Sequence, residues 1–255
     1  MAQRARAWQW LEQRPDVDVA LLQETAEPPA WTRDAFLSCV WRPRYASTRS
    51  GRSLWGSAVL ARSLKLEPCE PDERHPWLAE LAGSTAIART AGEPTWLVSV
   101  HLRDRQISEG ALERIPIDDI ELTAPNKKSP GGYSVWEPNV IPHELHRLFA
   151  DETFVWGGDF NTDPRMDDLK GFAGGNRRMF DIFREAGSHD MRNRFHSDYQ
   201  QSFFRESNRL PWQLDHVFAD AATEARTSTR NIDPTPAVGE DRCSDHAPII
   251  VDIAI

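Results

Sequence analysis

Runs of apolar residues, each bounded by turn-forming or charged residues, divide the chain into short strands and a few helices. The first helical pattern covers residues 3–13 and stops before Pro15. The next segment, VDVALLQE at 17–24, is typical of a buried strand. Further strands are predicted at 55–61, 84–90, 95–102, 153–158, 213–219 and 247–255. Helices are predicted at 140–150, 166–172 and 177–186.

This mixture of elements indicates the fold class. Strands repeatedly followed by a helix or loop predict an α/β or α+β architecture, in which helices cover the sheets. Repeats, low-complexity tracts and clear linkers are absent from the sequence, so residues 1–255 are expected to form a single domain. Residues 103–139 stand apart as a long irregular insertion, and such loops are often functional or disordered.

Composition narrows the class of protein. Hydrophobic residues make up 40% of the chain, which is enough for a core, and no apolar run is long enough to span a membrane. The N-terminal segment has no signal-peptide pattern. The three cysteines, Cys39, Cys69 and Cys243, are too widely spaced to suggest a disulfide framework or a structural zinc site. These features favour a cytoplasmic protein.

The charge of the chain does not decide whether its partner is nucleic acid. The net charge of −9 disfavours non-specific binding to nucleic acid, which needs a basic face. Arginines nevertheless cluster at 41–52, 101–105 and 192–195, where they either contact phosphate or are ordinary solvated charges. An acidic chain with such clusters also suits a site that binds phosphate through a metal ion.

Polar side chains gather at the ends of five predicted strands. They are Glu24, His101, Asp159, Asn161, Asp215, Asp245 and His246. Sheets that bring these ends to one edge would collect carboxylates, imidazoles and an amide in one pocket. That composition is typical of a phosphoester site with a hard cation.

The chemistry of the acidic groups suggests their roles. Mg²⁺ takes only one or two protein carboxylates, so Glu24 is the expected principal ligand and Asp245 a second one through water. Asp159 would orient or deprotonate the attacking water. Asn161 lies two residues further, on the same side of an extended chain, and would donate an amide N–H. Taken alone, Glu24 could equally be an ordinary strand-end residue.

The histidines are assigned in the same way. His246 is expected to contact the scissile phosphate, and Asp215 to fix its tautomer and raise its basicity. His216 should face away from the site, because neighbouring residues of a strand alternate. A lone strand-end histidine such as His101 is more commonly structural.

Five motifs in order, LLQE, SVH, GGDFN, LDH and SDHAPI, carry a resemblance to a known family. Over residues 17–254 the chain resembles the endonuclease/exonuclease/phosphatase family, which has the deoxyribonuclease I-like fold. The resemblance implies a four-layer sandwich of two packed mixed β-sheets flanked by helices. It also implies hydrolysis of phosphoester bonds with Mg²⁺ or Mn²⁺. His101 would then be a second phosphate-contacting or general-acid histidine.

The start of the chain departs from this family. Members usually open with a strand that carries an asparagine near its end, ahead of the helix that leads to LLQE. Here the sequence begins in that helix. Either the start of the chain is assigned too late, or the fold has lost a central strand, apparently the first, which would leave unpaired backbone groups and a gap in the core. The glutamate that often supports the histidine pair also has no clear counterpart.

Two weaker motifs are expected to be structural. HELH at 143–146 lacks the HExxH spacing of zinc proteases and predicts a solvent-facing helix. An aromatic group could stack bases but is expected mainly to pack in the core. Its members are Phe195, Phe203, Phe204 and Trp212.

Three functions follow as hypotheses. The first is a divalent-metal-dependent phosphodiester hydrolase, foremost a nuclease, that activates water for in-line attack on phosphorus. The second is a phosphatase or phosphodiesterase acting on lipid, inositol or other small phosphoesters, which the overall acidity slightly favours. The third is a truncated, non-catalytic member of the family that acts as a binding module.

Overall fold

The structure is a computed structural model. It describes residues 2–48, 51–69, 83–103, 107, 113, 120–121, 137–149, 152–169, 175–205, 210–238 and 242–254. Most of the predicted insertion at 103–139 therefore lies outside the described residues. Within the described ranges, no helix is long and apolar enough to cross a membrane.

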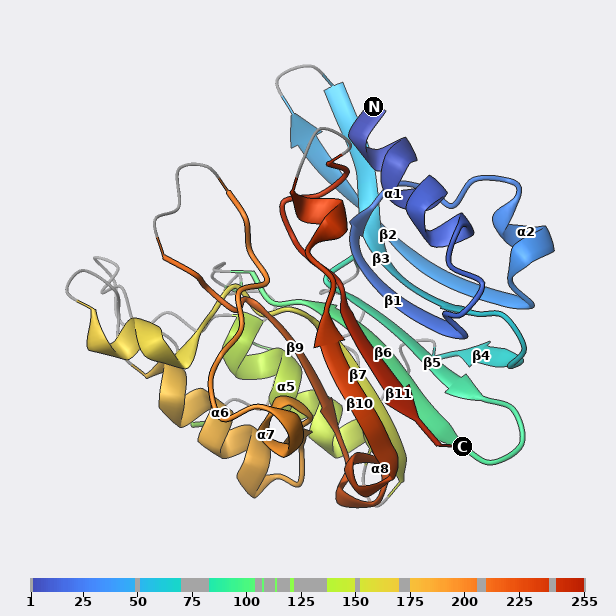
Figure 1. Cartoon of the computed structure of the whole chain (residues 1–255). Coiled ribbons are helices and arrows are strands. Elements are labelled where there is room, and N and C mark those ends of the chain that lie inside the picture. Colours follow the sequence, from blue (N-terminus) through green and yellow to red (C-terminus); the bar gives the residue numbers. More distant parts are fainter. Residues whose placement is uncertain are drawn as a thin grey trace.

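A six-stranded mixed sheet forms the centre of the molecule (Figure 1). Its strands follow the order β4 (Leu66–Pro68), β5 (Thr85–Thr90), β6 (Thr95–His101), β7 (Thr153–Asp159), β9 (Asp215–Ala219) and β8 (His189–Asp190). β6 and β7 run parallel, and the other neighbours are antiparallel. The central strands are buried on both faces, which is why their sequences read as continuous apolar runs.

A second layer of strands packs on one face of this sheet, and it is divided in two (Figure 1). One piece has the order β1 (Val19–Thr25), β3 (Gly51–Ala61) and β2 (Ser38–Thr48). The other pairs β10 (Thr227–Ile232) with β11 (Ile249–Ile253). Both pieces are antiparallel. An ion pair of 3.3 Å between Arg14 and Asp233 links them.

Helices cover the outer faces of both layers. They are α1 (Ala2–Glu12), α2 (Thr32–Ala35), α5 (Glu137–Phe149), α6 (Asn176–Glu185), α7 (Arg192–Phe195) and α8 (Ala221–Arg226), with 3₁₀ turns η1 (Pro164–Asp168) and η2 (Thr235–Ala237). Trp8 and Leu11 of α1 pack on Ala58 and Leu60 of β3. The predicted four-layer sandwich is thus confirmed, with its second layer of strands divided in two among the described residues.

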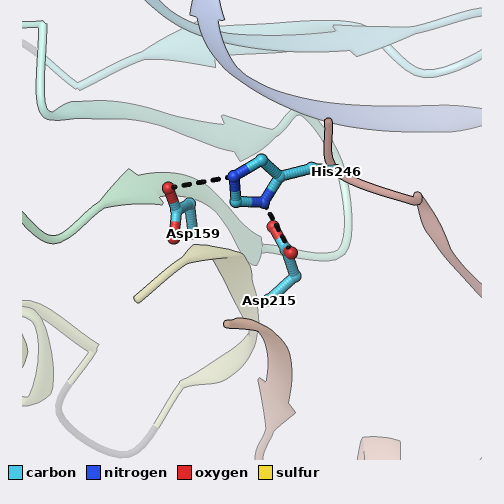
Figure 2. Close-up of side chains that lie close together, drawn as sticks. All are labelled: Asp159, Asp215 and His246. Carbon is cyan, nitrogen blue, oxygen red and sulfur yellow. Dashed lines mark hydrogen bonds and ion pairs between the residues drawn. The ribbon is translucent and has the colours of Figure 1, made fainter. Parts of the chain in front are cut away.

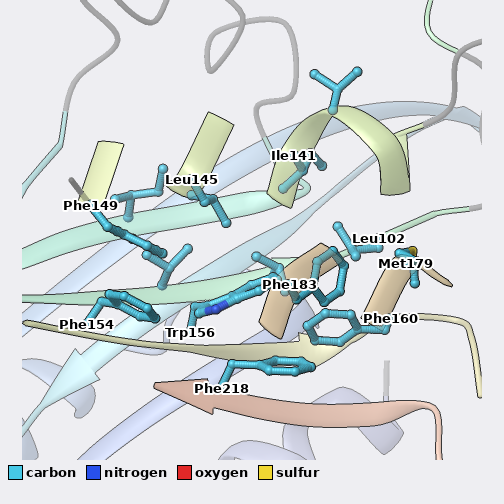
Figure 3. Close-up of a cluster of buried hydrophobic side chains, with 14 of the residues drawn as sticks. Leu102, Ile141, Leu145, Phe149, Phe154, Trp156, Phe160, Met179, Phe183 and Phe218 are labelled. Atoms are coloured by element: carbon cyan, nitrogen blue, oxygen red, sulfur yellow. The ribbon is translucent and has the colours of Figure 1, made fainter. Parts of the chain in front are cut away.

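The face of the central sheet that lies under α5 and α6 is packed with aromatic rings (Figure 3). Trp156 and Phe218 stack at 5.0 Å between ring centroids, and Phe183 closes over both. On the opposite face, smaller side chains of the central sheet such as Leu97 and Val155 pack with Val59 of the second layer. The two faces of one sheet therefore belong to two separate cores.

Two sequence predictions about helices are wrong. The α-helix expected at 166–172 is instead the 3₁₀ turn η1, because Asp163 caps Arg165 N–H and Pro164 opens the turn. The HELH helix does not face solvent at His146. That ring packs on Trp156 and Phe183, because position 146 belongs to the apolar stripe of α5.

Candidate active site

Three of the expected site residues occupy one row across the central sheet. His101 pairs in register with Asp159 of β7, and Asp159 pairs with Asp215 of β9. Residues in register on neighbouring strands point to the same face of a sheet. Here it is the face shared by Leu97 and Val155, which packs on the second layer. Strand pairing alone therefore brings these three side chains together.

His246 reaches this row from the segment that precedes β11 (Figure 2). Its Nδ1 lies 2.8 Å from Asp215 Oδ2, and its Nε2 lies 3.9 Å from Asp159 Oδ2. A backbone bridge joins Phe203 to His246, and the Phe203 ring lies against the imidazole at 4.9 Å. Because Asp215 can only accept in its ionised form, Nδ1 carries the proton of this bond.

Ser202 holds Asp215 in place. Its hydroxyl donates to Asp215 Oδ2 at 2.7 Å and accepts the backbone N–H groups of Leu214 and Asp215, both at 3.0 Å. The side chain is fully buried. Sequence reasoning missed this positioning residue, because no motif distinguishes the serine in QQSFF from an ordinary loop residue.

Asp159 and the two histidines beside it, His101 and His246, have displaced pKa values. Burial lowers the pKa of His246, but the charge and hydrogen bond of Asp215 outweigh burial and raise it to about 10. Burial, reinforced by the charge of Asp215, raises the pKa of Asp159 to about 7. Burial lowers the pKa of His101. Near neutral pH the site therefore holds one imidazolium, one neutral imidazole and a carboxyl group that titrates.

Asn161 lies beside Asp159, although not for the predicted reason. The chain is not extended there: Asn161 has φ 51°, in the left-handed region that asparagine tolerates. Its backbone N–H donates to Asp159 Oδ1 at 2.8 Å, and its amide donates to Asp159 Oδ2 at 3.1 Å. Gly158 makes the tight turn feasible, since a Cβ there would lie 2.0 Å from the Val100 carbonyl oxygen.

Glu24 and Asp245 lie next to this row, around a shared hollow of about 300 Å³. Glu24 Oε1 is 3.9 Å from His101 Nδ1, and Glu24 also has a left-handed backbone, with φ 50°. Strain of this kind in a residue other than glycine is common at functional sites. The contacts Glu24–His101, His101–Asp159 and Asp159–His246 thus run continuously from one side of the site to the other.

The donor atoms of this site fit a hard divalent cation. His101 Nδ1 is buried without a hydrogen-bond partner among the described residues, and the Glu24 carboxylate lies beside it. Carboxylate oxygens are the ligands that Mg²⁺ and Mn²⁺ prefer. Asp159, Asp215 and His246 also offer ligand atoms within 4.8 Å of one another.

His216 is excluded from the site, as predicted. It is fully buried on the helix-facing side of the sheet, where Phe160 and Phe180 pack on its ring. Its Nε2 lies 3.0 Å from the Gln213 carbonyl oxygen. Trp55 was not predicted as part of the site, but its ring lies 5.9 Å from that of His101.

The arginine clusters are largely structural where the structure describes them. Arg103 pairs with Glu137, and Arg42 donates to the Cys69 carbonyl oxygen at 2.9 Å. Arg192 is buried and lies 3.9 Å from the Tyr199 ring centroid. The side chains of 44–54 lie outside the described residues.

Fold and site together define a class of protein. A β-sandwich that gathers carboxylates and two histidines at one sheet edge, beside an acidic hollow, is suited to phosphoester hydrolysis. The sequence model of the Endonuclease/Exonuclease/phosphatase family matches residues 1–246, and the chain belongs to this family of hydrolases that act on phosphoester bonds. Among curated proteins, no sequence matches the chain.

Solved structures share the fold at low sequence identity. An AP endonuclease from Archaeoglobus fulgidus has a TM-score of 0.67 and 20% identity, over 99% of this chain and 94% of the other. The 3′ phosphatase NExo from Neisseria, bound to a product DNA hairpin, has a TM-score of 0.67 and 17% identity, over 98% and 95%. The AP endonuclease LMAP from Leishmania major has a TM-score of 0.64 and 18% identity, over 96% and 80%.

Proposed function

We propose that this protein is a divalent-metal-dependent phosphodiester hydrolase that cleaves nucleic acid. The observation that carries the proposal is the convergence of His101 Nε2 and His246 Nε2 on one oxygen of Asp159, at 3.6 and 3.9 Å. Structures with the same fold are described as AP endonucleases and as a phosphatase bound to DNA, which supports nucleic acid as the substrate.

Asp159 is the proposed general base. A carboxyl group with a pKa of about 7 is a competent proton acceptor near neutral pH. It would take a proton from water as the water oxygen bonds to phosphorus and the ester oxygen departs on the opposite side. Asn161 holds both oxygens of Asp159, so we assign it to positioning this base.

His246 is the proposed phosphate contact. Asp215 keeps it protonated and fixes the ring, so that a positive charge is available where negative charge accumulates on phosphate oxygens. His101, which is neutral and lies on the other side of Asp159, is the second histidine of the site.

Glu24 and Asp245 are the proposed metal ligands. A bound Mg²⁺ or Mn²⁺ would neutralise charge on the phosphate and on the leaving oxygen. Both carboxylates line the same hollow beside His101, where a cation would be partly enclosed. The cytoplasmic setting that the cysteines suggest stays a prediction.

Activity on defined substrates tests this proposal. With Mg²⁺ or Mn²⁺, the purified protein should cleave a duplex oligonucleotide, plain or with an abasic site, and EDTA should abolish cleavage. His246→Ala and Asp159→Asn should each lower kcat by about 100-fold or more, the usual cost of losing a charge-stabilising group or a general base. Glu24→Gln should raise the metal concentration needed for half-maximal activity.

His143→Ala is the matched control, because this histidine lies on α5, outside the row of site residues, and is 27% exposed. It should retain wild-type activity. Hydrolysis of inositol phosphates or bis-p-nitrophenyl phosphate without cleavage of nucleic acid would favour the small-phosphoester hypothesis instead. Failure on every substrate, with His246→Ala indistinguishable from wild type, would leave only a binding module.

A further inference from the structure

Glu24 does not point where the alternation of residues along β1 predicts. Neighbouring residues of a strand face opposite sides of a sheet. Leu21 packs in the core against the central sheet, whereas Leu22 packs in the core beneath α1. A regular strand would therefore turn Glu24 toward α1, like Leu22. Its carboxylate instead lies 3.9 Å from His101 Nδ1, on the central sheet.

A β-bulge in β1 accounts for this change of direction. Leu22 pairs with Ala58 and Thr25 pairs with Gly56, so β1 has one more residue than β3 between these two pairs. The left-handed backbone of Glu24, with φ 50°, lies within this bulge. Bulges re-aim a side chain and are common beside active sites. Because the conformation is strained in a residue other than glycine, contacts around the bulge must hold it.

Two hydrogen bonds connect the residues just ahead of Glu24 to the central sheet. They meet at Ser99 of β6, which lies two residues before His101 and therefore on the same face. The Ser99 hydroxyl donates to the Leu22 carbonyl oxygen at 2.7 Å and accepts the side-chain amide of Gln23 at 2.8 Å. The start of the bulge is thus held on the strand that carries His101.

These hydrogen bonds lie in a closely packed place behind the row of site residues. The Ser99 side chain is completely buried, so an unpaired hydroxyl there would be costly. A Cβ on Gly158 would lie 2.7 Å from Gln23 Nε2, so the glycine next to Asp159 leaves the space that Gln23 occupies. The Gln23 amide also donates to the Leu21 carbonyl oxygen at 3.1 Å. Gln23 therefore lies against both central strands, β6 and β7.

We propose that Gln23 and Ser99 are positioning residues for Glu24, and that they set the affinity of the site for its divalent cation through the Glu24 carboxylate. This role depends on the proposed function of Glu24 as a metal ligand. Gln23 and Ser99 hold β1 at the start of the bulge, so the carboxylate stays directed at the central sheet. Without them the strained backbone of Glu24 relaxes, and the cation loses a preformed ligand.

Metal binding in the absence of substrate tests this proposal. Mn²⁺ affinity is measured by electron paramagnetic resonance for wild type, Gln23→Met and Ser99→Ala. Methionine is unbranched like glutamine, so it retains the packing and removes the amide. Each variant should bind Mn²⁺ about 10-fold or more weakly, the usual cost of removing a residue that orients a metal ligand.

Ser188→Ala is the matched control. Ser188 is also completely buried and hydrogen-bonds two side chains, Trp156 and His146, but it lies on the helix side of the central sheet. Its replacement should lower Tm and leave Mn²⁺ affinity unchanged. A second comparison places Gln23→Met in the Glu24→Gln background. There it should weaken Mn²⁺ binding no further, because Gln23 acts through the Glu24 carboxylate.

Three results would overturn the positioning role and leave the proposed metal site in place. The first is weaker Mn²⁺ binding by Glu24→Gln with unchanged binding by Gln23→Met and Ser99→Ala. The second is equal weakening by Ser188→Ala, which would attribute the loss to stability alone. The third is a further loss caused by Gln23→Met in the Glu24→Gln background. Equal Mn²⁺ affinity of wild type and Glu24→Gln would instead remove Glu24 from the proposed metal site, and the positioning role with it.

Discussion

His246 experiences two opposing influences, burial and a hydrogen-bonded carboxylate, and the carboxylate prevails. In metal-free protein the imidazole should therefore titrate near pH 10, against about 6.5 for an unperturbed histidine. Asp215→Asn removes the largest charge that raises this pKa and leaves the burial that lowers it, so the titration should fall well below pH 10. NMR of the imidazole nitrogens measures both values. If His246 titrated near 6.5 in the wild-type protein, the assignment of Asp215 as its charge partner would be wrong.

Asp159, the proposed base, should lower the stability of the folded protein when its buried carboxyl group is ionised. Its pKa is raised to about 7, so the folded state holds a proton that the unfolded state releases near pH 4. Stability is therefore lost as pH rises from about 4 to 7. Asp159→Asn should be more stable than wild type at pH 8, by about 1 kcal/mol or more, and should show no such gain at pH 4.

Urea unfolding at both pH values measures this difference, and it should accompany the loss of activity in the same variant. A variant that is less stable than wild type at pH 8 would show that Asp159 is not strained by its buried charge.

At the scale of the element, α5 contains a histidine that is stable only when neutral. Ser188 Oγ accepts the indole N–H of Trp156 at 2.9 Å and is hydrogen-bonded to His146 Nε2 at 2.7 Å. Burial lowers the pKa of His146 to about 4, and the nearby charge of His143 adds to the effect. Protonation would bury a positive charge among the Trp156 and Phe183 rings.

Acid should therefore destabilise the packing of α5. Between pH 6.5 and 4 the unfolded state binds a proton at His146, whereas the folded state does not. The free energy of unfolding therefore falls as the pH falls through this range, by about 3 kcal/mol in total. His146→Gln retains a side-chain amide that can hydrogen-bond Ser188 and removes the titration, and its stability should change less over the same range. Chemical denaturation from pH 7 to pH 4 tests the slope, with His143→Gln as control.

The more completely a strand is buried, the more readily its sequence predicted it. β6 and β7 are apolar on both faces and stand out as continuous runs. β10, TSTRNI, and β2, which contains Pro43 between two arginines, were missed because they are polar. Among the described residues, β2 lies at the edge of its sheet and β10 pairs with β11 alone, so tertiary pairing rather than local propensity determines them.

At the scale of the whole molecule, the site was predictable where a strand end marked it and not elsewhere. His101, Asp159 and Asp215 each sit at the end of a recognisable apolar run. Ser202 and Phe203 come from a segment without a regular pattern, and they meet the site only because it folds back beside His246. Contacts of that kind depend on the packed molecule and leave no local signal.

The row formed by His101, Asp159 and Asp215 has a consequence for how such a protein can diverge. The backbone positions of these reacting groups are fixed by a cross-section of the sheet, and Ser202 and Asn161 hold the two carboxylates from the adjoining segments. Loops that select a substrate can therefore lengthen, shorten or be exchanged between relatives while the chemistry stays intact. Grafting whole loops should alter substrate preference before it abolishes hydrolysis.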